Sequence, residues 1–194
     1  MKNKSLSLVM LCVLFLLVGC NKDDDKISIE QTRQALFDMK AKYYGDLSVS
    51  FVNDANDLSV FKNFYVNSSD SLIFMMPLAP IANALTDKEI SKALKKIGEE
   101  RIAASYEFSQ IDDNGSFVSF GLIPKSIKLD IKSTDDTKAK TITILLSDIY
   151  GGNFSKQSTN NSLTFNVSPK EIIVDGVKIE DLKPMVYHYK GISE

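Results

Sequence analysis

The sequence predicts an α+β fold: a mainly antiparallel β-sheet, curled into a barrel or split into a sandwich, with an N-terminal helix and one inserted helix. Hydrophobic and polar residues alternate in about eight to ten short segments, separated by clusters of Ser, Thr, Asn, Asp and Gly. Only two segments show the three- to four-residue period of a helix. With 194 residues, 44% of them hydrophobic, the chain can form one sizeable core but not two comfortable domains.

The first residues have the pattern of a secretory signal peptide. Lys2 and Lys4 give a positive start, and an apolar run follows from Leu6 to Val18. A helix of that length covers roughly 20 Å, which is too short to span a hydrocarbon core about 30 Å thick. We therefore expect residues 1–19 to be a removable signal peptide rather than a core helix or a membrane-spanning helix.

The segment Leu17–Cys20, with the sequence LVGC, resembles the lipobox of bacterial lipoproteins. The resemblance implies cleavage before Cys20, a diacylglycerol on its sulfur and acylation of its new amine, so that lipid on Cys20 anchors the protein to a membrane. Cys12 would leave with the signal peptide, and the mature chain would then have neither a free thiol nor a disulfide. This excludes thiol catalysis and redox function, and the cysteine and histidine content disfavours zinc sites.

A dense run of charges follows the lipobox and predicts an acidic tether over residues 20–27. Within it, Lys22, Asp23 and Asp24 resemble the lysine-plus-acidic export signal that sends Bacteroidota lipoproteins to the outer face of the outer membrane. The tether and the export signal are compatible interpretations, because the solvated tether would contain the export signal. We expect a lipid-anchored, surface-exposed protein of the outer membrane.

The first helix is expected to begin after Ser28, because Gln31 completes a capping box with it. We expect Gly45 to end this helix, since the hydrophobic period changes to two from Asp46 onwards. The residues of the predicted buried face share the spacing of one side of a helix: Ile29, Leu36, Met39 and Tyr43.

The second helix is expected to begin at Thr86, again with a capping box, here to Glu89. Before it, Pro77 and Pro80 break the strand pattern. Its lysines and glutamates should face water. The residues of its predicted buried stripe are Ile90, Leu94 and Ile97.

The other elements are predicted strands within one domain, residues 28–194. The segments Asp112–Gly115 and Asp175–Gly176 carry the Asn-Gly and Asp-Gly pairs typical of hairpin turns, and we interpret Gly151–Gly152 as a turn or bulge. The predicted strands cover residues 46–51, 60–66, 72–76, 106–108, 117–123, 127–131, 142–146, 163–167, 172–179 and 185–190.

The order of these elements, and the segment Tyr43–Gly45 that leads into the first strand, resemble the lipocalin-like (calycin) lipoproteins of Bacteroidota. Several families of uncharacterised lipoproteins from these bacteria are similar too, with a signal peptide followed by one domain of about this size. The first resemblance implies that the sheet closes into a barrel.

No motif nominates a metal, a cofactor or catalytic residues. If Asp112–Gly115 belonged to an EF-hand, Gln110 and Gly121 would occupy its first and last ligand positions, and neither supplies the required carboxylate. We interpret Asn53–Asp57 and Asp135–Asp136 as loops. A calcium site formed by oxygens from separate loops remains open.

His188 is the only histidine and lies in the last predicted strand. It shares a face with Val186, whereas Tyr187 and Tyr189 point the other way. No Gly-x-Ser-x-Gly motif nominates a serine partner, so we expect an ordinary strand histidine at the sheet surface. If the tyrosine face is exposed, its rings are candidates for stacking on a sugar or a hydrophobic ligand, although core packing is the commoner use of aromatic residues.

Two short motifs complete the search. Gly151–Gly152 is followed by neither a lysine nor a predicted helix, which excludes a phosphate loop. The segment Asp70–Leu72 resembles the short O-glycosylation motif of exported Bacteroidota proteins, which makes Ser71 a candidate for modification.

These observations favour a non-enzymatic, lipid-anchored binding or accessory module, and the net charge of −2 argues against nucleic-acid binding. Its partner would be a glycan or a small hydrophobic molecule; a filled core would contradict the hydrophobic ligand. The alternative is a surface hydrolase or hydrolase inhibitor acting on glycans or peptides, which predicts a polar cleft with two carboxylates or a hydrogen bond between His188 and a serine. The candidate residues for contact with a hydrophobic ligand are Phe51, Phe74, Phe120 and Phe165.

Overall fold

The computed structural model describes residues 27–51, 54–66, 71–132 and 139–194. The predicted signal peptide, the lipidation site Cys20 and the export signal at Lys22, Asp23 and Asp24 lie outside the described residues. In the described part of the chain, no helix is long and apolar enough to cross a membrane.

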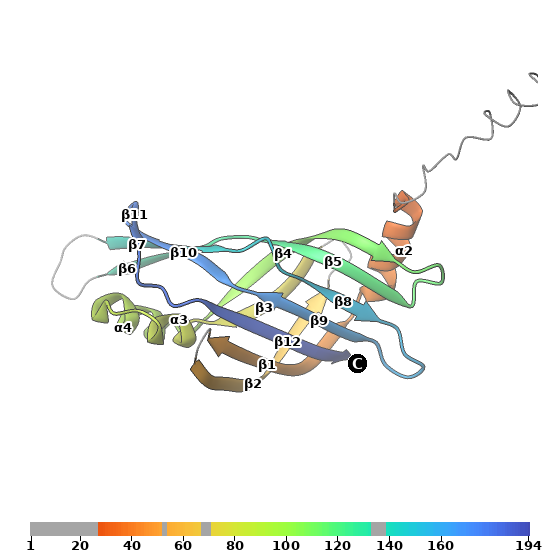
Figure 1. The fold of residues 1–194 in the computed structure, drawn as a ribbon, viewed down its shortest axis with the longest axis horizontal. Coiled ribbons are helices and arrows are strands. Elements are labelled where there is room, and N and C mark those ends of the chain that lie inside the picture. Colours follow the sequence, from red (N-terminus) through yellow and green to blue (C-terminus); the bar gives the residue numbers. More distant parts are fainter. Residues whose placement is uncertain (1–26, 52–53, 67–70, 133–138) are drawn as a thin grey trace, which may run out of the picture.

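Eight antiparallel strands form a closed ring, the barrel (Figure 1). Its strands follow one another around the ring in chain order, and pairing of the first with the last closes it. The α+β class is therefore confirmed, and the sheet forms a barrel rather than a sandwich. The barrel strands are β1 (Lys42–Phe51), β2 (Asp54–Val66), β3 (Ser71–Pro77), β4 (Glu99–Ile111), β5 (Phe117–Pro124), β8 (Gly151–Ser155), β9 (Ser162–Val167) and β12 (Met185–Ser193).

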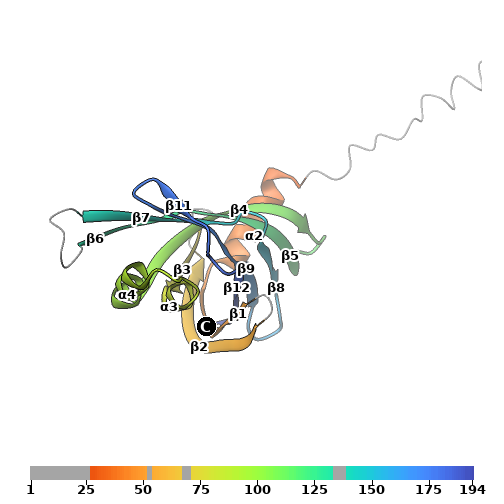
Figure 2. The same cartoon turned by 60° about the vertical axis from the view of Figure 1, so that its left-hand side comes forward.

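Two segments of the chain, one between β5 and β8 and one between β9 and β12, leave the barrel and form a second sheet with the strand order β11-β10-β7-β6. It extends from one end of the barrel, and helices α3 (Ala79–Asn83) and α4 (Lys88–Ile97) lie alongside it (Figure 2). An ion pair of 2.8 Å between Lys140 of β7 and Glu89 of α4 ties the two together. The strands of this sheet are β6 (Ile127–Lys132), β7 (Ala139–Leu146), β10 (Pro169–Val174) and β11 (Val177–Ile179).

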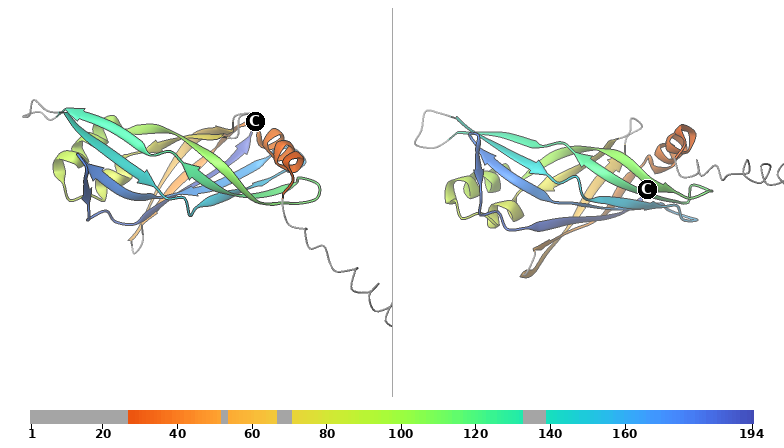
Figure 3. Two further views of the ribbon diagram at one scale, coloured as in Figure 1. Left: turned by 90° about the horizontal axis from the view of Figure 1, so that it is seen from above. Right: turned by 45° about the horizontal axis from the view of Figure 1, so that its top comes forward.

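Helix α2 (Ile29–Met39) covers the opposite end of the barrel (Figure 3). The capping box between Ser28 and Gln31 is confirmed, and Met39 is buried as expected. The predicted helix end at Gly45 is wrong, because Lys40 is already extended and Tyr43 belongs to β1, where its ring enters the barrel.

The barrel interior is filled by aromatic side chains. The ring of Phe165 lies 5.1 Å from Phe64, 5.2 Å from Phe74 and 4.5 Å from Tyr189, centroid to centroid. Phe74, Phe120 and Phe165 are at most 3% exposed, and Phe51 packs half-buried against the same core. This corrects the expected ligand cavity: the four phenylalanines contribute to a packed core.

Other local predictions have mixed outcomes. The turn at Asp112–Gly115 and the hairpin at Asp175–Gly176 are confirmed, the latter with positive φ values of 49° and 84°. Residues Asp54–Asp57 are part of β2 and not a loop, and Gly151–Gly152 begins β8 instead of forming a turn. Asp87, rather than Thr86, caps α4, and the short helix α3 was not predicted.

Candidate functional site

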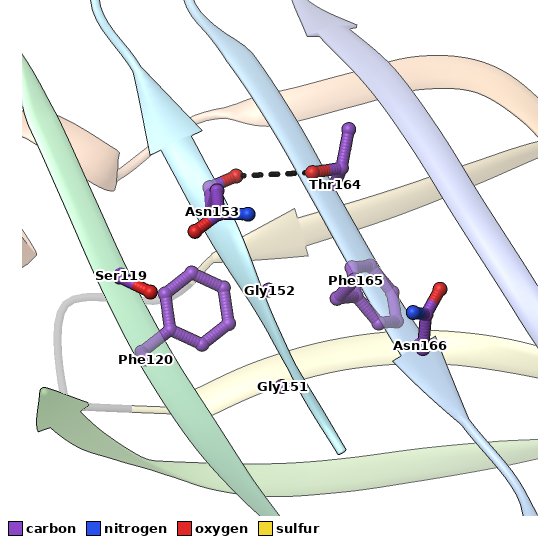
Figure 4. Close-up of a pocket in the computed structure, with 8 residues that line it drawn as sticks. All are labelled: Ser119, Phe120, Gly151, Gly152, Asn153, Thr164, Phe165 and Asn166. Carbon is purple, nitrogen blue, oxygen red and sulfur yellow. Dashed lines mark hydrogen bonds between the residues drawn. The ribbon is translucent and has the colours of Figure 1, made fainter.

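A polar hollow of about 300 Å³ lies on the barrel surface over strands β5, β8 and β9 (Figure 4). Gly151 and Gly152 of β8 contribute no side chains to it, and Gly121 of β5 stands opposite Gly151 without lining the hollow. The residues that line it are Ser119, Phe120, Gly151, Gly152, Asn153, Thr164, Phe165 and Asn166.

Strand alternation determines which side chains reach this hollow. Phe120 and Phe165 are buried in the barrel, so the residues beside them on each strand face outwards. A side chain at Gly151 would collide with the backbone of β5, because its Cβ would lie 1.9 Å from the carbonyl oxygen of Phe120. At Gly121, which stands opposite Gly151 on β5 but does not line the hollow, a Cβ would have only ordinary contacts, the nearest at 3.7 Å to the carbonyl oxygen of Glu107.

The polar side chains around the hollow are uncharged. Ser119 and Asn153 face each other across β5 and β8, and Thr164 stands opposite Asn153 on β9, with its hydroxyl 3.5 Å from the Asn153 carbonyl oxygen. Asn166 completes the rim. Hydroxyl and amide groups offer both donors and acceptors without a fixed charge, which suits a neutral ligand rich in hydroxyl groups.

Asn166 also connects the hollow to a row of hydrogen-bonded side chains on β1, β12 and β9. The Oγ of Ser50 lies 2.7 Å from Nε2 of His188, and Nδ1 of His188 lies 2.9 Å from Oδ1 of Asn166. Because an amide oxygen only accepts hydrogen bonds, Nδ1 of His188 is the protonated ring nitrogen in this contact and donates the hydrogen bond to Oδ1 of Asn166. In the neutral ring, Nε2 then accepts the Ser50 hydroxyl hydrogen.

The row fits what the hydrolase alternative predicts for His188, namely a hydrogen bond to a serine. It also confirms that His188 lies at the sheet surface. Sequence reasoning did not find Ser50 or Asn166, because they lie 138 and 22 residues from His188 and no local motif marks them. The signal that could have found them is the shared outward face of adjacent strands, which requires the strand pairing to be known.

Tyr187 and Tyr189 are not available for stacking on a ligand. Both are buried in the barrel, where their hydroxyls donate to the carbonyl oxygens of Pro77 and Met75, each at 2.9 Å. Burial raises the pKa of both phenols well above the usual value for tyrosine. Both tyrosines therefore contribute to the packing of the barrel core.

The other candidate positions, Asp112 and Ser71, lie in a turn and at the start of a strand. Asp112 uses its carboxylate within its turn, accepting from the amide of Phe117 and the hydroxyl of Ser116, and the bond from Phe117 is the main cause that lowers its pKa. Ser71 begins β3, half-buried and opposite Ser105. Among the described residues, no group of three or more His, Cys, Asp or Glu side chains could hold a metal ion.

In a comparison with protein families, residues 38–174 match the model described as domain of unknown function (DUF4840). The chain belongs to this family. The matched region contains the whole polar hollow and Ser50, and it ends before β12, which carries His188. No curated protein and no solved structure matches the chain.

Proposed function

We propose that this DUF4840 protein is a lipid-anchored module on the outer face of the outer membrane that binds a neutral, hydroxyl-rich ligand of the glycan class. The observation that carries the binding proposal is the hollow over Gly151 and Gly152, rimmed by uncharged hydroxyl and amide side chains. The packed aromatic core favours this outer site over the barrel interior.

The size and chemistry of the hollow support a small polar ligand. Its volume of about 300 Å³ is at the lower end of the range of ligand pockets, roughly 300–1,000 Å³. Charged groups would recognise phosphate or carboxylate ligands, and none lines the hollow among the described residues. Sugar hydroxyls can exchange hydrogen bonds with Ser119, Asn153 and Asn166.

The proposed cellular location rests on the sequence of the N-terminal segment. The LVGC segment ending at Cys20 supports lipidation, and Lys22, Asp23 and Asp24 support export to the surface. Cys20→Ala is expected to abolish fatty-acid labelling and release the protein from membranes. Protection of the protein from protease added to intact cells would contradict the surface location and leave the anchor standing.

Binding is tested with the purified lipoprotein in detergent on an array of neutral oligosaccharides of glucose, galactose, mannose and N-acetylglucosamine. We expect at least one of them to bind the natural protein and Ser119→Val to weaken that binding, because the valine removes a hydroxyl group that lines the hollow. Ser105→Val, on the exposed face of β4, is the matched control and should bind normally. Equal binding by Ser119→Val, or no binding to any oligosaccharide, would contradict the proposal.

The hydrogen-bonded row favours a second candidate function, a serine hydrolase acting on glycans or peptides. Ser50 would be the nucleophile, His188 the base and Asn166 the group that orients the ring. However, Ser50 pairs with Val186 of β12, which engages the backbone in the sheet on that side, so free donors for an oxyanion would have to come from the β2 side, where the pairing shifts between Val49 and Phe51. Labelling by a fluorophosphonate probe that Ser50→Ala abolishes would establish the hydrolase, and an unlabelled folded protein would exclude it.

A further inference from the structure

Helix α2 exposes large apolar side chains that the fold leaves uncovered. Ile29 is 83% exposed and Phe37 is 73% exposed, although both belong to a helix whose Ala35 and Met39 are fully buried. With Leu36 they form a stripe along the helix, which lines a shallow groove together with Thr32, Arg33 and Lys40. An exposed apolar stripe of this kind indicates an interaction surface.

The position of α2 in the chain points to what covers the stripe. Ile29 is only nine residues beyond Cys20, so at most about 3.6 Å per residue keeps it within roughly 32 Å of the lipidated residue. No other described helix or strand precedes it in the chain. Once Cys20 is anchored, α2 is thus, among the described elements, the one held nearest to the bilayer along the chain.

We propose that the stripe of Ile29, Leu36 and Phe37 lies in the interfacial region of the bilayer that holds Cys20, so that α2 orients the barrel on the membrane. This inference rests on the lipid anchor of the proposed function. Arg33 and Lys40 lie beside the stripe, and their long side chains can place apolar stems along it while their charges reach the lipid headgroups.

The attachment of α2 to the barrel would transmit this contact to the whole domain. The Tyr43 hydroxyl donates to the Met39 carbonyl oxygen at 2.6 Å, and Lys156 forms an ion pair of 3.4 Å with Asp38. Since the second sheet lies at the other end of the molecule (Figures 1 and 3), it would point away from the membrane. The polar hollow would then lie on the side of the barrel, open to solvent.

A second copy of the chain is a poorer occupant. Helix α2 has 11 residues and is thus about 16 Å long, so one of its faces cannot supply the roughly 800 Å² per partner that a stable interface buries. A bilayer sets no such requirement, because the acyl chains on Cys20 already hold the helix at the surface.

Single tryptophans test the inference, because the natural chain has none. The full lipoprotein is reconstituted into phosphatidylcholine vesicles with and without brominated lipid, which quenches nearby tryptophan. Phe37→Trp replaces an exposed ring on α2. The matched control is Val177→Trp, 67% exposed on β11 in the second sheet. We expect bromolipid to remove more than half of the fluorescence of the first variant and little of the second.

Each outcome decides between the proposals. If mass spectrometry shows acyl chains on Cys20 but Phe37→Trp is not quenched, the α2 inference fails and the anchor stands. If Cys20 carries no lipid, the anchor fails and the α2 inference with it. Adding Ile29→Ser to Phe37→Trp should weaken the quenching, and unchanged quenching would contradict the role of the stripe.

Discussion

Two glycines, Gly152 and Gly191, make room for the aromatic core of the barrel, and a third, Gly45, makes room for the backbone of β12. Gly45 and Gly191 stand opposite each other on β1 and β12. A Cβ at Gly191 would lie 2.6 Å from the ring of Phe64, and one at Gly152 would lie 2.7 Å from the Cβ of Phe165. Gly191 and Gly152 thus stand where a side chain would collide with Phe64 or Phe165 in the closely packed interior.

Gly191→Ala should therefore destabilise the protein. The added methyl group has no space beside Phe64, and such overpacking costs about 1–3 kcal/mol of the free energy of unfolding. Urea denaturation measures it, with Gly121→Ala as the control, since a Cβ at Gly121 has only ordinary contacts, the nearest at 3.7 Å. Equal stability of Gly191→Ala and Gly121→Ala would show that the core around Phe64 can rearrange to accommodate the added methyl group.

The buried tyrosines predict how stability depends on alkaline pH. Burial raises the pKa of Tyr43, Tyr106, Tyr187 and Tyr189 above that of an unfolded tyrosine, about 10. The unfolded chain therefore loses these protons first, so their contribution to stability is complete below pH 10 and is lost as the pH rises further. Phenolate absorbance at 295 nm should appear for these residues together with unfolding, as followed by circular dichroism. Ionisation of all tyrosines near pH 10 in a folded protein would contradict their burial.

At the scale of elements, local signals were predictable and their exact ends were not. The capping box at Ser28 and the Asp-Gly turn at Asp175 depend on neighbouring residues, so the sequence alone reveals them. The sequence predicts the start of α4 one residue too early, because Thr86 also has the chemistry of a cap. In the folded chain, the amide and hydroxyl of Thr86 bond to Asp181, which is distant in sequence.

Asp87 is accordingly the cap whose loss should weaken α4. Its carboxylate accepts from the amides of Glu89 at 2.9 Å and Ile90 at 3.0 Å. Asp87→Ala should cost about 1 kcal/mol, whereas Asp87→Asn keeps a side-chain oxygen and should cost much less. Thermal denaturation compares the two, and similar losses in both variants would point to the charge rather than the cap.

At the scale of the whole molecule, alternating strands predicted the mainly antiparallel sheet but could not decide between barrel and sandwich. Closure depends on β1 pairing with β12, which joins Leu47 to Tyr189, far apart in the chain. The same long-range pairing brings Ser50 to His188 and Asn166. The surface row and the hollow could therefore be located only after the sheet was closed.

Closure also assigns the two faces of the barrel strands different roles. Inward residues such as Phe74 and Phe165 form a packed core, and that core leaves the outer face as the place for binding. The proposed molecule is anchored at its α2 end and presents its polar hollow on the side of the barrel. Of these features, the hollow carries the functional claim.

Hydrogen–deuterium exchange of the lipoprotein tests that claim most directly, with and without the oligosaccharide that binds best on the array. Slower exchange is expected in peptides from β5, β8 and β9, around Gly121, Asn153 and Asn166, and no change is expected in β3 or α4. Protection that instead appears away from these three strands, or no protection at all, would contradict a ligand site in the polar hollow.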